Sequence, residues 1–190
     1  MNVYDFDGTI YDGDSTIDFY LFALKKHPMI IRYLPKQLMG FIRYGLKQID
    51  KTELKEDFFS FLKSVPAEEL VKEFWKQHSS RIFRWYLDQQ RPDDIVVSAS
   101  PEFLLRPVCQ KLGIQYLVAS DVEPTDGHFR SQNCYGKDKV QFLYCAYPAC
   151  KIDRFYSDSQ SDLPLAKLAD EAYLVRKGNV SPWEIPADSN

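Results

Sequence analysis

The sequence predicts an α/β fold in which a parallel sheet carries a long helical insertion after its first strand. A short apolar run at residues 3–6 stops at Gly8, which is typical of a buried strand that ends in a turn. Later in the chain, short β-branched runs alternate with helical patterns, and this alternation indicates a parallel sheet covered on both faces. We therefore expect a Rossmann-like core domain at residues 1–14 and 89–190, with an all-helical domain inserted at residues 15–88.

Spacing and proline positions divide the chain into elements. Within the insertion, apolar residues recur at helical spacing, and we expect four or so helices and no strand. The core is expected to contain, in chain order, a strand at 95–97, a helix at 102–112, a strand at 116–119, a hairpin at 121–135 with its turn at Asp126-Gly127, a helix at 137–146, a strand at 152–156, a helix at 163–169 and a strand at 172–175. Residues 181–190 have the composition of a poorly structured tail.

Composition argues against several classes of function. A net charge of -3 offers no basic excess, so we expect no nucleic-acid partner. The four cysteines lack the C-x-x-C spacing of a structural zinc site and are expected to be reduced thiols. Charged residues and a proline interrupt the most apolar long region, residues 29–46, so we expect no transmembrane helix. Met1 is followed at once by a strand-like run without the pattern of a signal peptide, and we expect a cytoplasmic location.

The strongest local signal is the run Asp5-Phe6-Asp7-Gly8-Thr9 at the end of the first strand. A spacing of two places both carboxylates on one side of an extended strand end. Like charges so close are destabilising unless a cation lies between them or one carboxylate is protonated. Gly8 permits a sharp exit from the strand, and Thr9 adds a hydroxyl beside the same site. A single D-x-D is often only a turn with exposed acids, but here three further polar features accompany it.

These three features also fall at strand ends or helix starts. They are Ser98-Ala99 after the strand at 95–97, Lys137-Asp138-Lys139 at a helix start, and the run from Ser157 to Asp162 after the strand at 152–156. A strand-to-helix turn offers a hydroxyl and N–H groups to a phosphate, and a lysine placed against the helix dipole suggests another task for its charge. Each has an ordinary alternative as an N-cap, a solvated lysine or surface acids. Together they mark the strand edge where open α/β sheets bind ligands.

With these four features in this order, the sequence resembles the haloacid dehalogenase-like (HAD) hydrolases, and within them the branch of phosphoserine phosphatase and related small phosphatases. The D-x-D-x-T at residues 5–9, the strand-end Ser98, the following lysine and the acidic D-x-x-x-D at residues 158–162 match the pattern of that family over roughly the whole chain. The first and last motifs are specific, whereas the serine and the lysine are persuasive through order and spacing. The resemblance implies a Mg²⁺-dependent phosphomonoester hydrolase that acts through an aspartyl-phosphate on a small phosphate ester.

The resemblance also implies a role for each residue. Asp5 would attack phosphorus, and Asp7 would protonate the leaving group and then activate water. The carboxylates of Asp5 and Asp158, with the Asp7 backbone carbonyl, form an all-oxygen ligand set that suits Mg²⁺. Asp162 would support the site, and Ser98 and a lysine would hold the phosphoryl oxygens.

Two positions do not follow directly from the family pattern: the catalytic lysine and residue 157. Lys139 is preferred as the catalytic lysine because it directly precedes the apolar residue Val140 that starts the helix, but an alternative alignment selects Lys137. Ser157 stands where the family has a glycine, and a residue this small should still fit. The residues expected to contact the substrate are Thr9, Asp14, Ser98 and Ala99.

In this branch the helical insertion is a cap that closes over the active site and selects the substrate, and residues 15–88 have the matching position. Phosphoserine phosphatases bind the substrate amine through an acid shortly after the first motif, as Asp14 is placed here. They bind its carboxylate through a cap arginine, and alignment puts Phe58 at that position. Because an apolar ring cannot pair with a carboxylate, we expect phosphoserine to be a poor substrate.

A basic stretch lies between Phe19 and Ile49, without a single Asp or Glu. The commonest interpretation is a solvated helical face over an apolar one, and this ranks first. Attraction of anionic substrates ranks second, and peripheral contact with an acidic membrane surface ranks third. The basic residues are Lys25, Lys26, Arg32, Lys36, Arg43 and Lys47.

Other functions are compatible with the same motifs. A phosphotransferase would pass the phosphoryl group from the same aspartyl-phosphate to an acceptor other than water. Dehalogenases lack the second acid, so Asp7 argues against them. A binding or regulatory module that has lost turnover is expected to have lost Asp5 or Asp7, and both are present.

Overall fold

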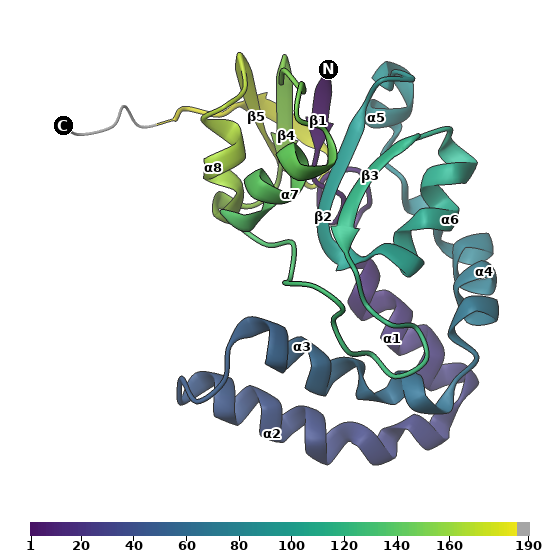
Figure 1. Cartoon of the computed structure of the whole chain (residues 1–190). Helices are drawn as coiled ribbons and strands as arrows, with labels where there is room; N and C mark the ends of the chain where they lie inside the picture. Colours follow the sequence, from purple (N-terminus) through teal and green to yellow (C-terminus); the bar gives the residue numbers. More distant parts are fainter. Residues whose placement is uncertain (186–190) are drawn as a thin grey trace.

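The computed structural model describes residues 1–185 and contains a six-stranded sheet with helices on both faces (Figure 1). The strand order is β3-β2-β1-β4-β5-β6, formed by β1 (Asn2–Tyr4), β2 (Ile95–Pro101), β3 (Tyr116–Ser120), β4 (Arg154–Ser157), β5 (Glu171–Arg176) and β6 (Asn179–Pro182). Strands β1 to β5 are parallel, and β6 pairs antiparallel with β5. The predicted α/β class with a parallel core sheet is confirmed, and β6 is an additional edge strand that the sequence did not predict.

Side chains alternate across the sheet, so the molecule has a hydrophobic core on each face. Tyr4 and Val96 belong to a cluster that also contains residues of the helices on one face, whereas Val3 and Ile95 belong to the cluster on the other face. The first face is covered by α6 (Glu102–Leu112) and by helices of the insertion. The second is covered by α7 (Asp138–Ala146) and α8 (Leu163–Ala166).

The insertion is helical throughout, as predicted. It contains α1 (Ser15–Lys26), α2 (Leu34–Gly45), α3 (Lys51–Phe59), α4 (Ala67–His78) and α5 (Arg84–Gln89), with short 3-10 helices η1 (Pro28–Tyr33), η2 (Ser60–Ser64) and η3 (Ser79–Arg81). Local signals set the helix starts: Asp14 accepts a hydrogen bond from the Ile17 N–H at α1, and Asp50 and Glu53 form a capping box at α3. Between residues 15 and 88, the only β-contact is an isolated bridge from Ile82 to Tyr11.

The helices of the insertion differ in how they attach to the sheet. Trp75 of α4 packs edge-on against Phe6 with ring centroids 5.9 Å apart, and its indole N–H donates to the Leu104 carbonyl at 2.6 Å. In contrast, α2 and α3 pack on one another and lie beyond the strand ends (Figure 1). The hydrophobic cluster of the first face therefore continues from the sheet into α1 and α4, and the division into a core and a separate domain at residues 15–88 stays a prediction.

A long loop, residues 121–137, runs from β3 down to α3 (Figure 1). The Phe129 N–H donates to the Glu56 carboxylate at 2.9 Å, and the rings of Phe129 and Phe59 have centroids 6.3 Å apart. Gly127 has a φ of +83° and lies so close to α3 that a Cβ there would overlap the carbonyl oxygen of Phe59. The loop thus fastens the insertion to the sheet.

Three sequence predictions need correction. The hairpin predicted at 121–135 has its turn, but backbone pairing ends at Arg130, because the chain then passes toward α3. The strand predicted to end at Val97 continues to Pro101. Residues 181–182 belong to β6 and Trp183 is buried, so the predicted disorder is wrong there, and residues 186–190 lie outside the described part of the chain.

The close approach of the loop to α3 generates a first prediction. Gly127→Ala is expected to lower the free energy of unfolding by about 2–4 kcal/mol, because the new Cβ adds overlap with backbone to the strain of a left-handed conformation. Gly113→Ala is the matched control: its φ of +76° imposes the same strain, but nothing lies within 4 Å of the added Cβ. It should lose only about 1 kcal/mol. Urea unfolding measures both, and equal losses would contradict the close contact.

Candidate active site

Asp5 lies directly after β1, at the carboxyl end of the sheet. Its backbone N–H donates to the Tyr156 carbonyl at 2.9 Å, so the pairing of β1 with β4 continues one residue past the strand. The Asp5 side chain is buried, and its residue is only 8% exposed. Because β1 is central in the sheet, the residues that follow its neighbours β2 and β4 are brought beside Asp5.

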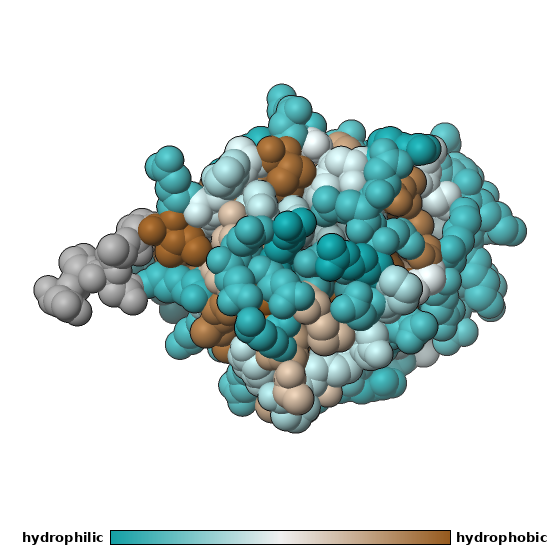
Figure 2. All heavy atoms as spheres, turned by 90° about the horizontal axis from the view of Figure 1, so that it is seen from above, coloured by the Kyte–Doolittle hydropathy of each residue, from teal (hydrophilic) through white to brown (hydrophobic). Residues whose placement is uncertain are grey.

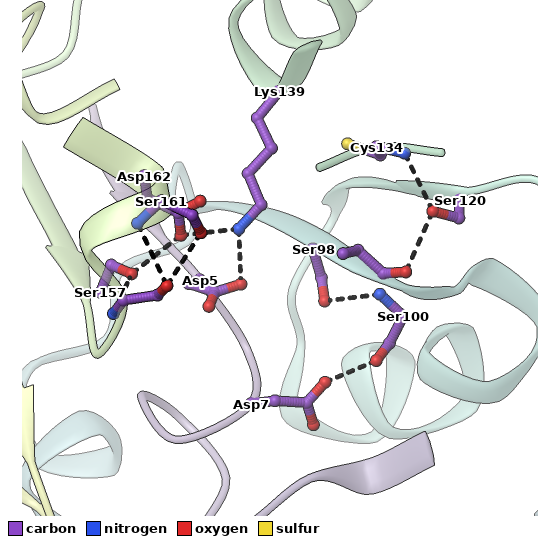
Figure 3. Close-up of polar contacts among 12 residues, drawn as sticks. Asp5, Asp7, Ser98, Ser100, Ser120, Cys134, Lys139, Ser157, Ser161 and Asp162 are labelled. Atoms are coloured by element: carbon purple, nitrogen blue, oxygen red, sulfur yellow. Dashed lines mark hydrogen bonds and ion pairs between the residues drawn. The ribbon is translucent and has the colours of Figure 1, made fainter. Parts of the chain in front are cut away.

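One lysine joins two of the predicted carboxylates. The Lys139 ammonium nitrogen from α7 lies 2.9 Å from Asp5 Oδ1 and 2.8 Å from Asp162 Oδ2 (Figure 3). All three side chains are buried. Ser157, which replaces the glycine of the family pattern, donates its hydroxyl to Asp162 Oδ2 at 2.8 Å. Lys137 is exposed and belongs to no ion pair in residues 1–185, so the geometry favours Lys139 of the two candidates.

Burial dominates the electrostatics of this group. It raises the pKa of Asp5 to about 7, against the opposing effect of Lys139 and with a further increase from Asp162. Burial also acts to lower the pKa of Lys139, but the two carboxylates outweigh it and hold that pKa above its ordinary value. The lysine therefore stays charged and is the built-in counter-ion of Asp5.

Asp7 is held by two hydrogen bonds. Its Oδ1 accepts from the Ser15 N–H at the start of α1 at 2.6 Å, and its Oδ2 accepts from the Ser100 hydroxyl at 2.5 Å. Burial and the nearby Asp14 raise the pKa of Asp7 to about 6, although both hydrogen bonds oppose the increase. A carboxyl group with this pKa is protonated in part near neutral pH, as an acid catalyst requires.

The serines of β2 point toward this acid (Figure 3). Because the strand continues past Val97, residues 98 and 100 lie on the same side of it, and Ser100 reaches Asp7. The Ser98 hydroxyl accepts a hydrogen bond from the Ser100 N–H at 3.1 Å. Sequence analysis named Ser98 and missed Ser100 as a contact of Asp7, since it ended the strand too early. A strand extended by three residues would have predicted both.

A cavity of about 550 Å³ opens over these groups. Most of the predicted residues line it: Asp5, Asp7, Asp14, Ser98, Ala99, Lys139, Asp158 and Asp162. Thr9, expected to contact the substrate, does not: it is fully buried, and its hydroxyl has no hydrogen-bond partner among the described residues. Asp14 is exposed at the cavity wall and caps α1 with its side chain.

The insertion supplies the opposite wall, including residues that sequence analysis missed. Lys55 of α3 donates to the Ala99 carbonyl at 2.6 Å and to the Asn133 side chain at 2.9 Å, and burial lowers its pKa to about 8. Lys51, one turn earlier, lies over the ring of Tyr135, 3.1 Å from the centroid. The spacing of four residues was a signal that both lysines share one helix face, but nothing in the sequence said that this face meets the cavity.

Five carboxylates and three lysines line the cavity, and this balance suits a divalent cation. The carboxylates are Asp5, Asp7, Asp14, Asp158 and Asp162, and the lysines are Lys51, Lys55 and Lys139. An anionic substrate would add further negative charge, which a bound cation offsets. The groups near Asp5 that could bind a cation are carboxylate and carbonyl oxygens, the class of ligand that Mg²⁺ prefers.

The backbone near Asp158 fits the predicted ligand set. Gly8 has a φ of +69°, and a Cβ there would overlap the Asp158 carboxylate, so the peptide that carries the Asp7 carbonyl lies against that carboxylate. Burial and Asp162 raise the pKa of Asp158, against the opposing effects of Lys139 and Arg176. In residues 1–185, no three Asp, Glu, His or Cys side chains group as a metal site. The predicted metal-ligand set needs only two side chains, those of Asp5 and Asp158, since the third ligand is the backbone carbonyl of Asp7.

Comparison with known proteins identifies the family. Residues 3–167 match the family model of the haloacid dehalogenase-like hydrolases. The match covers most of the chain, and the chain belongs to this family.

Individual relatives agree with this assignment. Protein CicA of Caulobacter vibrioides is 24% identical over 197 residues, covering 92% of this chain and 86% of that protein. A protein of unknown function from Bordetella pertussis Tohama I has a similar structure, with a TM-score of 0.71 and 22% identity over 88% of this chain and 85% of that chain. A phosphoserine phosphohydrolase-like protein from Francisella tularensis has a TM-score of 0.59 and 16% identity, over 90% and 86% of the two chains. The predicted resemblance is confirmed at the level of family and fold.

The buried lysine generates a second prediction. In the presence of a chelator, Lys139→Met is expected to lower the free energy of unfolding at pH 8 by about 3–5 kcal/mol, because two buried carboxylates lose their counter-ion. The deficit should shrink toward pH 5. Carboxyl groups with a raised pKa in the folded state bind protons that the unfolded chain releases, so stability increases as the pH falls.

Urea unfolding at the two pH values measures this deficit. Lys137→Met is the matched control, since that side chain is exposed and should change stability little. A deficit of the same size at both pH values, or an equal loss in the control, would contradict the role of Lys139 as a buried counter-ion.

Proposed function

We propose that the protein is a Mg²⁺-dependent phosphatase that hydrolyses a small phosphate monoester through an aspartyl-phosphate on Asp5. The observation that carries the proposal is the pairing of Asp5 with Lys139 beside a second acid, Asp7, whose pKa is raised to about 6. This reaction requires a nucleophile, a fixed positive charge and a proton donor from the protein, and Asp5, Lys139 and Asp7 would supply them in that order. Membership of the hydrolase family supports the same conclusion.

In the first step, an Asp5 carboxylate oxygen attacks phosphorus, and the bond from phosphorus to the ester oxygen breaks. Asp7 gives its proton to the departing oxygen, which leaves as an alcohol. Hydrogen bonds from Ser15 and Ser100 fix the Asp7 carboxyl group in the orientation needed for this transfer. Lys139 and Ser98 line the cavity beside Asp5 and would balance and bind the oxygens of the transferred group.

In the second step, the aspartyl-phosphate is hydrolysed. Asp7, now ionised, takes a proton from a water molecule as that water attacks phosphorus, and the acyl phosphate bond breaks. Inorganic phosphate and the Asp5 carboxylate are released, and Asp7 is protonated again. The same carboxyl group thus acts as acid and then as base, so its pKa must lie near the working pH.

The carboxylates of Asp5 and Asp158 and the carbonyl of Asp7 would hold Mg²⁺, with Asp162 in support. When bound, the ion supplies positive charge that lowers the repulsion between the nucleophile and the phosphate. Asp162 contributes by holding Lys139, and Ser157 holds Asp162 in turn. The replacement of glycine by Ser157 therefore supports the site rather than disturbing it.

The insertion would act as the cap that selects the substrate. Phe58 lines the cavity and packs in an aromatic cluster with Tyr20 and Phe61, 5.1 and 6.1 Å between ring centroids. An apolar wall at this position supports a substrate other than phosphoserine. A phosphotransferase would use the same groups with an alcohol in place of water, and it stays the alternative. A cytoplasmic location and the lack of a nucleic-acid partner also stay predictions.

The mechanism predicts which changes abolish activity. Asp5→Asn is expected to reduce hydrolysis of an aryl phosphate at least about a thousandfold, because an amide side chain cannot form the acyl phosphate intermediate. Chelation of divalent ions should abolish wild-type activity, and added Mg²⁺ should restore it. Asp93→Asn is the control, since Asp93 is exposed and away from the cavity. Activity that survives both chelation and Asp5→Asn would refute the mechanism.

The cap predicts a substrate preference. Phosphoserine is expected to give a kcat/KM below about 10⁴ M⁻¹s⁻¹, the low end for committed enzymes, because Phe58 offers its carboxylate no ion pair. Phe58→Arg should raise kcat/KM for phosphoserine relative to an aryl phosphate, and Phe58→Leu should not. Steady-state assays of free phosphate measure both, and a wild-type value above that limit would contradict the proposal.

A further inference from the structure

The exposed apolar residues of the molecule are concentrated on one helix and the turn before it. Fifteen large hydrophobic residues are exposed in the described chain, and nine of them lie within residues 29–46. They include Met29, Leu38, Phe41, Ile42 and Leu46, each more than half exposed. An apolar surface as concentrated as this marks an interaction site in most proteins.

Helix α2 packs on the protein with its small and polar side. Gln37 and Gly40 are its only buried residues. The Gln37 amide donates to the Phe58 carbonyl at 2.8 Å, and a Cβ on Gly40 would lie 2.9 Å from the Asp57 Cβ. Spacings of four residues place Leu34, Leu38 and Ile42 on one side of α2, where they are exposed to solvent. The interpretation ranked first from sequence, an apolar side buried beneath a solvated one, is therefore wrong for α2.

Exposed basic residues precede, interrupt and follow the apolar region at residues 29–46 in the chain. Lys25, Arg32 and Lys47 are exposed and form no ion pair with any carboxylate in residues 1–185, and the sequence holds no acid from residue 19 to 49. We call the exposed apolar residues of η1 and α2, with these basic residues, the α2 surface. Figure 2 views the molecule from the side opposite α2 and shows mainly hydrophilic residues with isolated hydrophobic ones. The concentration of exposed apolar residues on η1 and α2 is thus not repeated on that side.

Charge distinguishes the occupants that such a surface could bind. A second copy of the chain would place the same surface against itself, and residues 19–49 supply no acid to pair with the basic residues of the other copy. An anionic lipid surface offers negative head groups to the lysines and an acyl boundary to the apolar side. Helix α2 has twelve residues, roughly 18 Å at 1.5 Å per residue, so it suits an orientation in the plane of a bilayer. None of the helices in residues 1–185 combines the length and the apolar character needed to span one.

We propose that the α2 surface binds the protein peripherally to an anionic lipid bilayer, with α2 lying flat at the head-group boundary. Phe41 belongs both to this surface and to the lining of the catalytic cavity, so bound protein holds the mouth of the cavity at the bilayer. The inference rests on exposure and charge alone and does not depend on the proposed reaction.

Vesicle flotation of the full chain tests the proposal. Wild-type protein should float with vesicles of phosphatidylcholine containing about one-third phosphatidylglycerol, and far less with phosphatidylcholine alone. The double variant Leu38→Ser with Ile42→Ser should lower partitioning more than tenfold, because two exposed apolar groups lose their lipid contact. The control is Leu87→Ser with Leu168→Ser, residues of similar exposure on other elements, which should float as wild type.

A variant without two of the lysines separates the contribution of charge to lipid binding from that of apolar contact. Lys25→Gln with Lys47→Gln should reduce binding to anionic vesicles by roughly fivefold per lysine and leave the weak binding to phosphatidylcholine unchanged. Thermal unfolding of every variant verifies the fold. Absence of wild-type flotation, or equal flotation of the Leu38→Ser, Ile42→Ser variant, would refute the proposal. So would sedimentation that shows a wild-type dimer and a monomeric double variant, since the surface would then bind a second copy.

Discussion

The ion pairs of Lys139 are the interaction on which the catalytic edge of the sheet depends. Asp5 follows β1 and Asp162 follows β4, so one ammonium group from α7 ties the ends of two neighbouring strands together. Neither acid is stable as a buried anion without that charge. The same contact engages Asp5 through Oδ1 and thereby fixes the carboxylate toward the cavity. The Lys139 ammonium group thus serves both the stability of the sheet edge and the chemistry of the site. Each of the three buried charges needs the other two to be stable.

Much of this edge could be predicted from the sequence, because parallel strands bring their carboxyl ends to one place. The apolar run before Asp5 and the acids after β4 were enough to put Asp5, Asp158 and Asp162 at the same edge. Strand β6 was missed for a physical reason: its four residues are all exposed, so they carry no alternation of apolar and polar side chains. It is held by backbone pairing with β5, which composition does not encode.

The wall that faces the catalytic residues was harder to predict. Lys55 looks like a solvated lysine on a helical pattern, and its burial depends on where the loop at 121–137 runs, a segment without periodicity. Helix α2 shows a related limit. Periodicity identifies the apolar side of a helix, but it does not say that this side faces inward, and here it faces out. Sequence patterns therefore predicted site residues most accurately at strand ends, where buried position and function coincide.

The central position of β1 has a consequence for the order in which the sheet can be completed. Strand β1 precedes both of its neighbours in the chain and pairs with β2, from residues 95–101, on one side and with β4, from residues 154–157, on the other. Until β4 pairs with β1, Asp5 lies at an open strand edge, and Asp162, which follows β4, is not in place to hold Lys139. Asp5 thus acquires its partners only after the chain has been synthesised as far as Asp162, so the catalytic edge is completed late relative to the nucleophile that it serves.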